Sequence, residues 1–271
     1  MDPMDIQLLE KEEERLSFII RGISIETANA LRRTMLSEVP CMAIDDVVMI
    51  ENSSIIHDEI LAHRLGLVPL RTDLDAFVFP EECDCSNELG CSKCRSILTL
   101  EAEATDETRT VYSGELKPTD QHTSTSTDKI PIVKLAPGQK VKLEAYARLG
   151  TGKMHAKWQA VAVSAYKFVP VVLVDEKKCK GVKECVRVCP KGVFEMSSGK
   201  AKVARLLSCI ECFDCVKACP NDAITVEWEK DGLIFNVESV GFMSPEEVVL
   251  RASDILNGKA EEFASEVREL D

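Results

Sequence analysis

Closely spaced cysteines constrain this 271-residue chain more than any other feature. The segment CIECFDCVKACP, residues 209–220, has two, two and three residues between its cysteines and ends on a proline. The segment CKGVKECVRVCP, residues 179–190, repeats the pattern thirty residues earlier, but Val182 stands where the second cysteine would fall. In such runs three thiolates bind one iron-sulfur cluster, and the cysteine before the proline binds the other cluster. The spacing predicts an iron-sulfur domain, with a structural zinc site as the alternative.

This rule divides the seven cysteines into two sites. The complete site, which suits a 4Fe-4S cluster, consists of Cys189, Cys209, Cys212 and Cys215. The second site has three thiolates, those of Cys179, Cys185 and Cys219. Three thiolates suit a 3Fe-4S cluster, whereas a 4Fe-4S cluster with another ligand and an empty site are the alternatives. Val182 is then an apolar filler.

A third group of cysteines lies in an acidic loop. Within twelve residues the chain offers the four thiols of Cys83, Cys85, Cys91 and Cys94. Four thiolates at such short spacing predict a closed, tetrahedral Zn²⁺ site of the structural kind. Free thiols and a rubredoxin-like iron are the alternatives. The metal would fold a loop that is too polar to bury a core of its own.

Composition and charge limit the compartment and the partners. The chain carries a formal net charge of −13, which repels a phosphate backbone, so direct binding of nucleic acid is not expected. The N-terminus has no secretory signal, and no apolar run approaches the roughly 20 residues that span a bilayer. We therefore expect a cytoplasmic protein with no membrane segment. Twelve cysteines in a reducing compartment indicate metal binding rather than disulfides. Cys41 lies outside the three groups and is expected to be a small buried hydrophobe.

Periodicity predicts a mixture of helices and strands. Alternation predicts a β-hairpin over residues 4–21 and strands over 43–51, 96–116, 130–149 and 233–241. Helical spacing predicts helices over 25–40, 57–65 and 244–270, and the polar residues 119–128 have the composition of a flexible loop. Ser244, Pro245 and Glu247 form the N-terminal cap of the last helix. Its apolar stripe requires a partner helix.

Motifs for catalysis are missing from the sequence. No Asp-x-Asp-x-Asp run could hold the Mg²⁺ of a polymerase, and no Gly-x4-Gly-Lys-Ser/Thr loop could bind phosphate. Gly150-Thr-Gly152 is expected to be a turn, and His63 and His155 are expected to be surface or packing residues. We therefore predict a chain without catalytic residues.

Four further segments carry a resemblance to a known family. They are NALRRTMLSEVP (29–40), DEILAHRLGLVPL (58–70), GTGKMHAKWQ (150–159) and VESVGFMSPEEVV (237–249). In this order they resemble the signature segments of the D subunit of archaeal RNA polymerase, the counterpart of the bacterial alpha subunit's N-terminal domain and of the third-largest eukaryotic subunit. The loop at 83–94 is similar to the zinc loop of the eukaryotic counterpart, and the cysteine repeat resembles an insert that several archaeal D subunits carry.

The resemblance implies an α+β fold in three parts. Residues 1–41 and 229–271 would form a discontinuous, alpha-subunit-type dimerisation domain. Residues 42–170 would form an inserted, mainly β domain that includes the cysteine loop, and residues 171–228 a ferredoxin-like cluster domain.

The resemblance also implies partners. The chain would form a heterodimer with the L subunit, and the pair would be the platform on which the large catalytic subunits dock, together with the small N and P subunits. The residues expected to contact partners are Leu31, Arg32, Arg33, Met35, Ile255, Leu256, Phe263 and Val267. For Arg32 and Arg33 the alternative is an ordinary solvated helix face.

Two functions follow from these features. The first is a non-catalytic assembly subunit of a DNA-directed RNA polymerase, whose clusters stabilise one domain and, in a variant of this hypothesis, regulate assembly through their sensitivity to oxygen. The second is a ferredoxin-like electron carrier, because a small two-cluster domain ordinarily carries electrons. The missing ligand at Val182 favours the first, since a carrier needs two electronically matched clusters.

Overall fold

The computed structural model describes residues 3–85, 87 and 90–270. The described residues divide into two compact units. The first unit comprises residues 3–10, 17–25 and 165–236, and the second comprises residues 11–16, 26–164 and 237–270. Both units contain helices and strands, so the predicted mixed α and β composition is confirmed.

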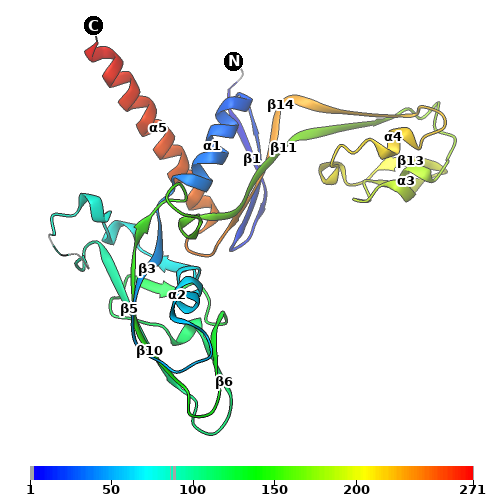
Figure 1. The fold of residues 1–271 in the computed structure, drawn as a ribbon. Helices are drawn as coiled ribbons and strands as arrows, with labels where there is room; N and C mark the ends of the chain where they lie inside the picture. The colour runs from blue at the N-terminus through cyan, green and yellow to red at the C-terminus, as the bar shows by residue number, and fades with distance from the viewer. Residues whose placement is uncertain (1–2, 86, 88–89, 271) are drawn as a thin grey trace. The chain divides into compact units, whose positions relative to one another are not determined.

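A four-stranded sheet in the order β1-β2-β14-β11 forms the framework of the first unit. Its strands are β1 (Asp5–Lys11), β2 (Arg15–Arg21), β14 (Ile224–Ser239) and β11 (Val161–Val174). The first two strands form the predicted hairpin, in which the Glu12 N–H donates to the Arg15 carbonyl at 2.8 Å. The sheet therefore joins the N-terminal hairpin to a strand that lies more than 200 residues later in the chain. Figure 1 shows β11 and β14 running side by side toward the cysteine repeat.

Aromatic side chains hold three strands of this sheet together. The Phe235 ring is fully buried and stacks on Phe18 of β2, with the ring centroids 5.3 Å apart and the planes 4° from parallel. Tyr166 of β11 meets the same ring at 5.3 Å and a tilt of 41°. Each pair adds about 1 kcal/mol beyond the burial of apolar area.

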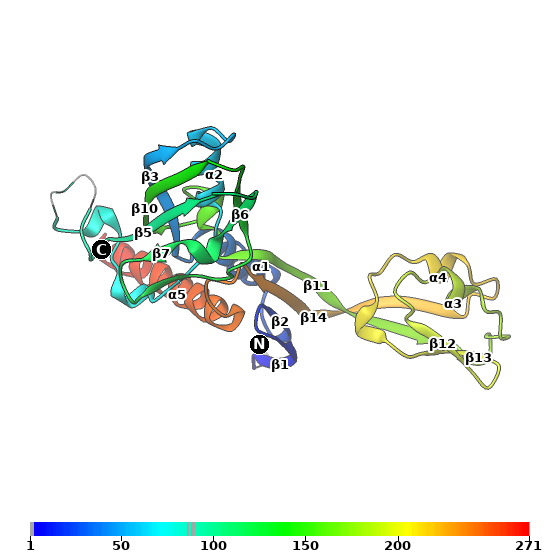
Figure 2. The ribbon, with the colours of Figure 1, turned by 90° about the horizontal axis from the view of Figure 1, so that it is seen from below.

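The cysteine repeat forms short elements between β11 and β14. They are α3 (Glu184–Val188), β12 (Phe194–Ser197), β13 (Lys200–Val203), the 3₁₀ turn η5 (Leu206–Ser208) and α4 (Asp214–Lys217). The two strands pair in an antiparallel hairpin. In Figures 1 and 2 these elements lie together at the C-terminal end of β11 and the N-terminal end of β14. The sequence predicted a strand, a turn and a helix in each half, and the helices are present in both.

A second four-stranded sheet, in the order β3-β10-β5-β7, lies in the other unit. Its strands are β3 (Cys41–Asn52), β10 (Lys140–Gly150), β5 (Arg95–Glu103) and β7 (Lys117–Pro118), and helix α2 (Asp58–Gly66) contacts β3. Two small antiparallel pairs complete this unit: β4 (Leu70–Thr72) with β8 (Thr123–Thr125), and β6 (Arg109–Tyr112) with β9 (Pro131–Leu135). The polar residues 119–128 thus contain a paired strand, and the prediction of a flexible loop there is wrong. Backbone hydrogen bonds to β4 satisfy this segment even though its side chains are polar. Three further 3₁₀ turns, η1 (Leu74–Ala76), η2 (Pro80–Glu82) and η3 (Ser113–Glu115), connect these elements.

The turn predicted at Gly150-Thr-Gly152 is present at the end of β10, and Gly150 lies against the Trp158 ring. A Cβ on Gly150 would lie 2.5 Å from the Trp158 ring, and one on Gly152 would lie 2.2 Å from the Leu36 carbonyl oxygen. The Lys153 N–H donates to the Ser37 carbonyl at 2.8 Å. Both glycines are therefore needed because other groups come too close for a side chain.

A partly buried ion-pair cluster covers the same tryptophan. The Asp45 carboxylate accepts hydrogen bonds of 2.5 Å from Arg148 Nε and from Lys157 Nζ. Both cations lie over the Trp158 ring. Arg148, near the end of β10, is 4.9 Å from the ring centroid, and Lys157, in the turn η4 (Ala156–Trp158), is 4.3 Å from it. Burial alone raises the pKa of Asp45, but the hydrogen bonds and charges of its two partners outweigh burial and hold the pKa below its usual value.

Helices α1 (Ile25–Ser37) and α5 (Pro245–Glu269) belong to the second unit. The predicted cap of α5 is present, because the Ser244 hydroxyl accepts a hydrogen bond from the Glu247 N–H at 3.2 Å and Pro245 opens the helix. Within the described part of the chain, no helix combines the length and the apolar character that crossing a bilayer requires.

Candidate metal and partner sites

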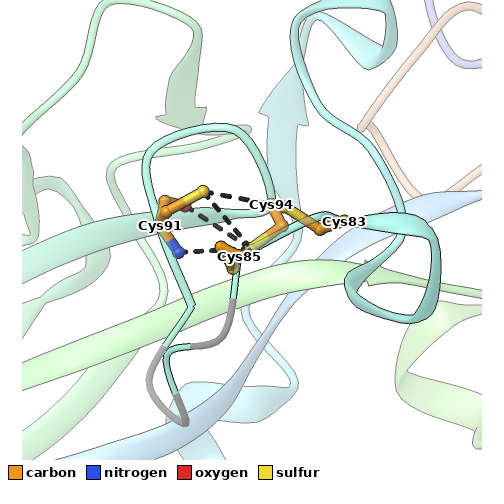
Figure 3. A group of neighbouring side chains, drawn as sticks. All are labelled: Cys83, Cys85, Cys91 and Cys94. Carbon is orange, nitrogen blue, oxygen red and sulfur yellow. Dashed lines mark hydrogen bonds between the residues drawn. The ribbon is translucent and has the colours of Figure 1, made fainter.

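The four cysteines of the acidic loop converge on one point, as Figure 3 shows. The sulfur atoms lie 3.7 Å apart for Cys83 and Cys91, 3.7 Å for Cys85 and Cys94, and 4.0 Å for Cys91 and Cys94. All four lie within 4.8 Å of one another, so that together they could hold one metal ion. Hydrogen bonding by the Lys93 backbone lowers the pKa of the Cys91 thiol to about 7, whereas burial raises the pKa of Cys94, so Cys91 forms a thiolate before Cys94 does.

Four cysteines of the repeat line one pocket. Cys189, Cys209, Cys212 and Cys215 share it with apolar side chains that include Val193 and Phe194. The structure thus brings the cysteine before the first proline together with three cysteines of the second half. Burial raises the pKa of Cys215 to about 11, and the charges of the other three cysteines act in the same direction.

The other three cysteines of the repeat form a group of their own. Burial raises the pKa of Cys185, and the neighbouring charges of Cys179 and Cys219 raise it further, so the three thiols lie within electrostatic reach of one another. Val182, at the position of the missing cysteine, is 38% exposed. It is therefore only partly covered and is not the fully buried apolar filler that was expected.

Backbone N–H groups point at the sulfur atoms in both halves of the repeat. The Val193 N–H donates to Cys189 Sγ at 3.3 Å, and the Ala223 N–H donates to Cys219 Sγ at 3.4 Å. In each half the donor lies four residues after the cysteine that precedes the proline. Such hydrogen bonds to sulfur stabilise thiolate ligands and tune the potential of a bound cluster. The two halves of the repeat therefore have matching local geometry despite the difference at Val182.

Lys167 of β11 lies beside the complete group, and sequence reasoning missed it. Its ammonium donates to the Leu207 and Cys209 carbonyl oxygens at 2.6 Å and 2.7 Å. Burial lowers the pKa of Lys167, while the charges of Cys209 and Glu211 act in the opposite direction. The available signal was a single lysine within the apolar strand sequence VAVSAYKFVPVVLV.

The residues expected to contact partners lie in different environments. Leu31 and Met35 are buried within the chain, Met35 completely, so these two are core residues and offer no surface to a partner. On α5, Ile255 and Leu256 are half-buried, whereas Phe263 is 69% and Val267 44% exposed.

The two arginines of α1 also differ from each other. Arg32 is half-buried and donates from Nε and Nη2 to the Asn29 side-chain oxygen at 3.1 Å and 3.0 Å, while Arg33 is exposed.

The expected histidine and cysteine environments are found. Cys41 is buried, and burial raises its pKa to about 12, so it is the small core hydrophobe that was predicted. His63 is exposed, and His155 packs edge-on against Trp158, with the ring centroids 6.4 Å apart.

The family model that describes the RNA polymerase Rpb3/Rpb11 dimerisation domain matches residues 17–260, and this match places the chain in a class of subunits that dimerise. The chain is 39% identical over 270 residues to a DNA-directed RNA polymerase subunit Rpo3 of Methanosphaera stadtmanae, covering 98% of this chain and 99% of that one. It is 40% identical over 266 residues to the Rpo3 of Archaeoglobus fulgidus, with 98% of each chain covered.

A eukaryotic relative is similar over almost the same length. The DNA-directed RNA polymerase II subunit rpb3 of Dictyostelium discoideum is 35% identical over 289 residues, covering 98% of this chain and 95% of the relative. The chain belongs to the Rpo3 family of DNA-directed RNA polymerase subunits, the D subunits of archaea. It is a non-catalytic assembly subunit of a nucleotidyltransferase complex. The family resemblance stated from the sequence is confirmed.

Proposed function

We propose that the chain forms a heterodimer with the L subunit and that this pair is the platform on which the large catalytic subunits and the small N and P subunits assemble. The observation that carries the proposal is the outward apolar face of α5. This helix is 25 residues long, and Val248 and Ala252 in its first half are fully buried in the chain itself. In its second half Phe263 and Val267 lie one turn apart and are largely exposed to solvent.

An exposed aromatic residue at helical spacing indicates a surface that a partner covers. Interfaces between permanent partners bury on the order of 2,000 Å² or more and are apolar. We propose that Ile255, Leu256, Phe263 and Val267 contribute to such an interface, within a dimerisation domain of residues 1–41 and 229–271. Support for a domain made from both ends comes from the pairing of β2 with β14. Residues 42–170 would be the inserted domain that meets the large subunits.

A charge placed on α5 tests this interface. Phe263→Glu should abolish copurification of the L subunit with the chain, because an unpaired carboxylate would be buried. Ser265→Glu adds the same charge on the opposite side of the same helix and should leave copurification unchanged. Equal binding of L by both variants would contradict the proposal.

Arg33, the exposed arginine of α1, is proposed to contact a large subunit. Arg32 lies next to it and is held in position by hydrogen bonds from Arg32 to the Asn29 side chain. Arg33→Ala should weaken docking of the large subunit and leave the heterodimer intact. An unchanged assembly would instead favour an ordinary solvated helix face.

We also propose that the repeat, residues 171–228, is a ferredoxin-like domain. Cys189, Cys209, Cys212 and Cys215 would hold a 4Fe-4S cluster, for which support comes from their shared pocket and from the N–H groups aimed at sulfur. Cys179, Cys185 and Cys219 would hold a second cluster. Because Val182 supplies no fourth thiolate, this cluster would be of the 3Fe-4S type or of the 4Fe-4S type with another fourth ligand. Such clusters would bond distant loops through iron and so stabilise the domain.

The loop 83–94 is proposed to hold Zn²⁺. Zinc at about 2.3 Å from four sulfur atoms in a tetrahedron separates these atoms by about 3.8 Å. The distances of 3.7, 3.7 and 4.0 Å in this loop support tetrahedral coordination of one metal ion by the four sulfur atoms. Analysis of iron, sulfide and zinc in anaerobically purified protein, with electron paramagnetic resonance of the clusters, tests all three sites. Finding no iron or no zinc would contradict the corresponding assignment.

The role of the clusters is tested by the double variant Cys209→Ser, Cys212→Ser. We expect it to keep the L subunit and to lose stable association of the large subunits, because the cysteines lie far in sequence from α5. An electron carrier would be favoured instead if the variant retained the large subunits, and if the wild type but not the variant transferred electrons to a ferredoxin-dependent enzyme. The proposal places the protein in the cytoplasm, where a reducing environment keeps its cysteines available to metals. Assembly under air and under anaerobic conditions then shows whether loss of the clusters regulates the polymerase.

A further inference from the structure

One lysine connects the framework sheet of the first unit to the loop that carries the complete cysteine group. Lys167 lies in the middle of β11, seven residues before the strand ends at Val174. Its two chain neighbours, Tyr166 and Phe168, make ring contacts with Phe235 and Trp228 of β14. Because side chains alternate along a strand, Lys167 extends from the opposite face of β11. It reaches the turn η5 and the cysteine that follows it.

The contact is made to the backbone and therefore fixes the path of the loop. The ammonium donates to the carbonyl oxygens of Leu207 and Cys209, at 2.6 Å and 2.7 Å. The sulfur of the same cysteine accepts the Glu211 N–H at 3.4 Å, and Glu211 has a positive φ of 54°. Cys209 is thus held at its carbonyl by the strand and at its sulfur by its own loop.

The charges around this contact are balanced within the first unit. The ammonium of Lys167 interacts favourably with the charges of Cys209 and Glu211 and unfavourably with that of Lys191. One carboxylate oxygen of Glu211 is buried without a hydrogen-bond partner, so the nearby ammonium is a main source of stabilisation for it. An ammonium that lost both carbonyl oxygens while remaining half-buried would be unfavourable, and the strand around it would open more often.

We infer that Lys167 is a positioning residue that ties the cluster loop to strand β11, so that occupancy of the complete cluster controls the stability of the framework sheet. The inference rests on the cluster binding proposed above. With the cluster bound, Cys209 is fixed and its carbonyl receives the lysine. When the cluster is lost, the loop is free to move, the two hydrogen bonds break, and β11 loses a connection on one face. Loss of the cluster thereby lowers the stability of the sheet that contains the N-terminal hairpin.

The test compares three variants of the full chain, purified anaerobically with the L subunit. Lys167→Met keeps the apolar stem and removes the donors, whereas Lys167→Arg keeps the charge and the donors. Lys202→Met is the matched control, because Lys202 is an exposed lysine of β13 in the same domain. Iron content is measured first: wild-type protein without iron would contradict the proposed cluster, which is a separate failure from that of the inference.

Hydrogen exchange measured by mass spectrometry then reports on residues 161–170 and 205–212. In iron-loaded Lys167→Met, exchange in both segments should be at least about tenfold faster than in wild type, since each of the two hydrogen bonds lost from the charged ammonium contributes about 1.5 kcal/mol. Removing iron should accelerate exchange in residues 161–170 of wild type and of Lys202→Met, with little further effect in Lys167→Met. Such non-additivity shows that the lysine and the cluster act through one connection.

Two results would overturn the inference. One is equal exchange of residues 161–170 in iron-loaded wild type and Lys167→Met. The other is an equal acceleration by iron removal in both proteins. If Lys167→Met does not hold iron, the arginine variant decides the question, because it must hold iron and protect both segments as wild type does. An arginine variant as poor in iron as the methionine variant refutes the inference.

Discussion

Phe235 provides the sharpest test of the sheet that joins the two ends of the chain. Its ring is fully buried, stacks on Phe18 at 5.3 Å and meets Tyr166 at 5.3 Å, so that one side chain of β14 connects β2 with β11. Replacing a buried phenylalanine by alanine costs about 3–5 kcal/mol. At a typical urea dependence of about 2 kcal/mol per molar, Phe235→Ala should lower the unfolding midpoint of this unit by about 2 M.

The two tryptophans of the chain allow the two units to be observed separately. Trp228 lies on β14 in the first unit, 6.1 Å from Phe168, and Trp158 is buried in the second unit. In a Trp158→Phe background, fluorescence of Trp228 reports unfolding of the first unit, and the converse background reports the second. The midpoint seen by Trp228 should fall in Phe235→Ala while that seen by Trp158 stays in place.

Phe235→Leu is the matched control, because it keeps most of the apolar volume and should cost less than about 1.5 kcal/mol. If alanine and leucine gave the same midpoint, packing of this ring would not hold the sheet together. If both tryptophans reported the same shift for Phe235→Ala, the two units would unfold together and the assignment of the effect to one sheet would be wrong.

Three further perturbations address the second unit. Asp45→Asn should reduce the free energy of unfolding seen by Trp158 by about 2 kcal/mol at pH 7. The folded pKa of Asp45 lies below its ordinary value of about 3.9, so the stabilisation by its charge is complete above about pH 4. The difference in free energy of unfolding between wild type and Asp45→Asn should therefore shrink as the pH falls further. A difference that does not depend on pH would exclude the charge as its cause. Gly152→Ala should destabilise the same unit by at least about 2 kcal/mol, since its Cβ would meet the Leu36 carbonyl at 2.2 Å, and unchanged urea unfolding would show that the turn does not press on α1. Cys94→Ser, or removal of metal by a chelator, should release one zinc per chain and increase proteolysis within residues 83–94, whereas Cys41→Ser should retain the zinc.

Local signals predicted the elements whose stability is decided locally. The cap of α5 formed as expected because the Ser244 hydroxyl accepts the Glu247 N–H in the first turn, and Pro245 at the first helical position has no N–H that needs a partner. The N-terminal hairpin followed from alternation on both sides of a charged turn. The grouping of Cys83, Cys85, Cys91 and Cys94 followed from spacing, because short runs between cysteines limit which sulfur atoms can meet.

Contacts between distant segments were not predictable in the same way. The pairing of Thr123–Thr125 with Leu70–Thr72 depends on neighbours fifty residues away, and the polar side chains gave no sign of it. Strand β14 begins at Ile224, well before the predicted start at 233, because pairing with β11 continues through a Lys-Asp-Gly sequence that is typical of a turn. There Gly232 lies where a Cβ would come within 3.0 Å of Val169 on the neighbouring strand. Tertiary pairing thus overrode a local turn signal.

The partner surface shows a similar limit. Leu31 and Met35 were expected to contact a partner, like Phe263 and Val267, since all four lie on apolar helix faces at the same spacing. Periodicity identifies a face that is buried and cannot say whether the chain itself or a second chain covers it. In the structure the residues of α1 are covered from within, and those in the second half of α5 are exposed.

The composition of the buried core indicates that the cysteine repeat would depend on its proposed clusters more than the sheet that carries it does. The core of the repeat combines Val172, Ile224 and Val226 of the two long strands with three cysteines, and the segment between the strands adds Val193, Phe194 and Ala201. Ordering residues 175–222 costs conformational entropy at every residue, and few of their side chains are fully buried. Bonds between cysteine and iron in the proposed clusters would offset part of that cost. The framework sheet carries its own aromatic core, so it would stay folded without a cluster, although less stable for the loss of the Lys167 connection.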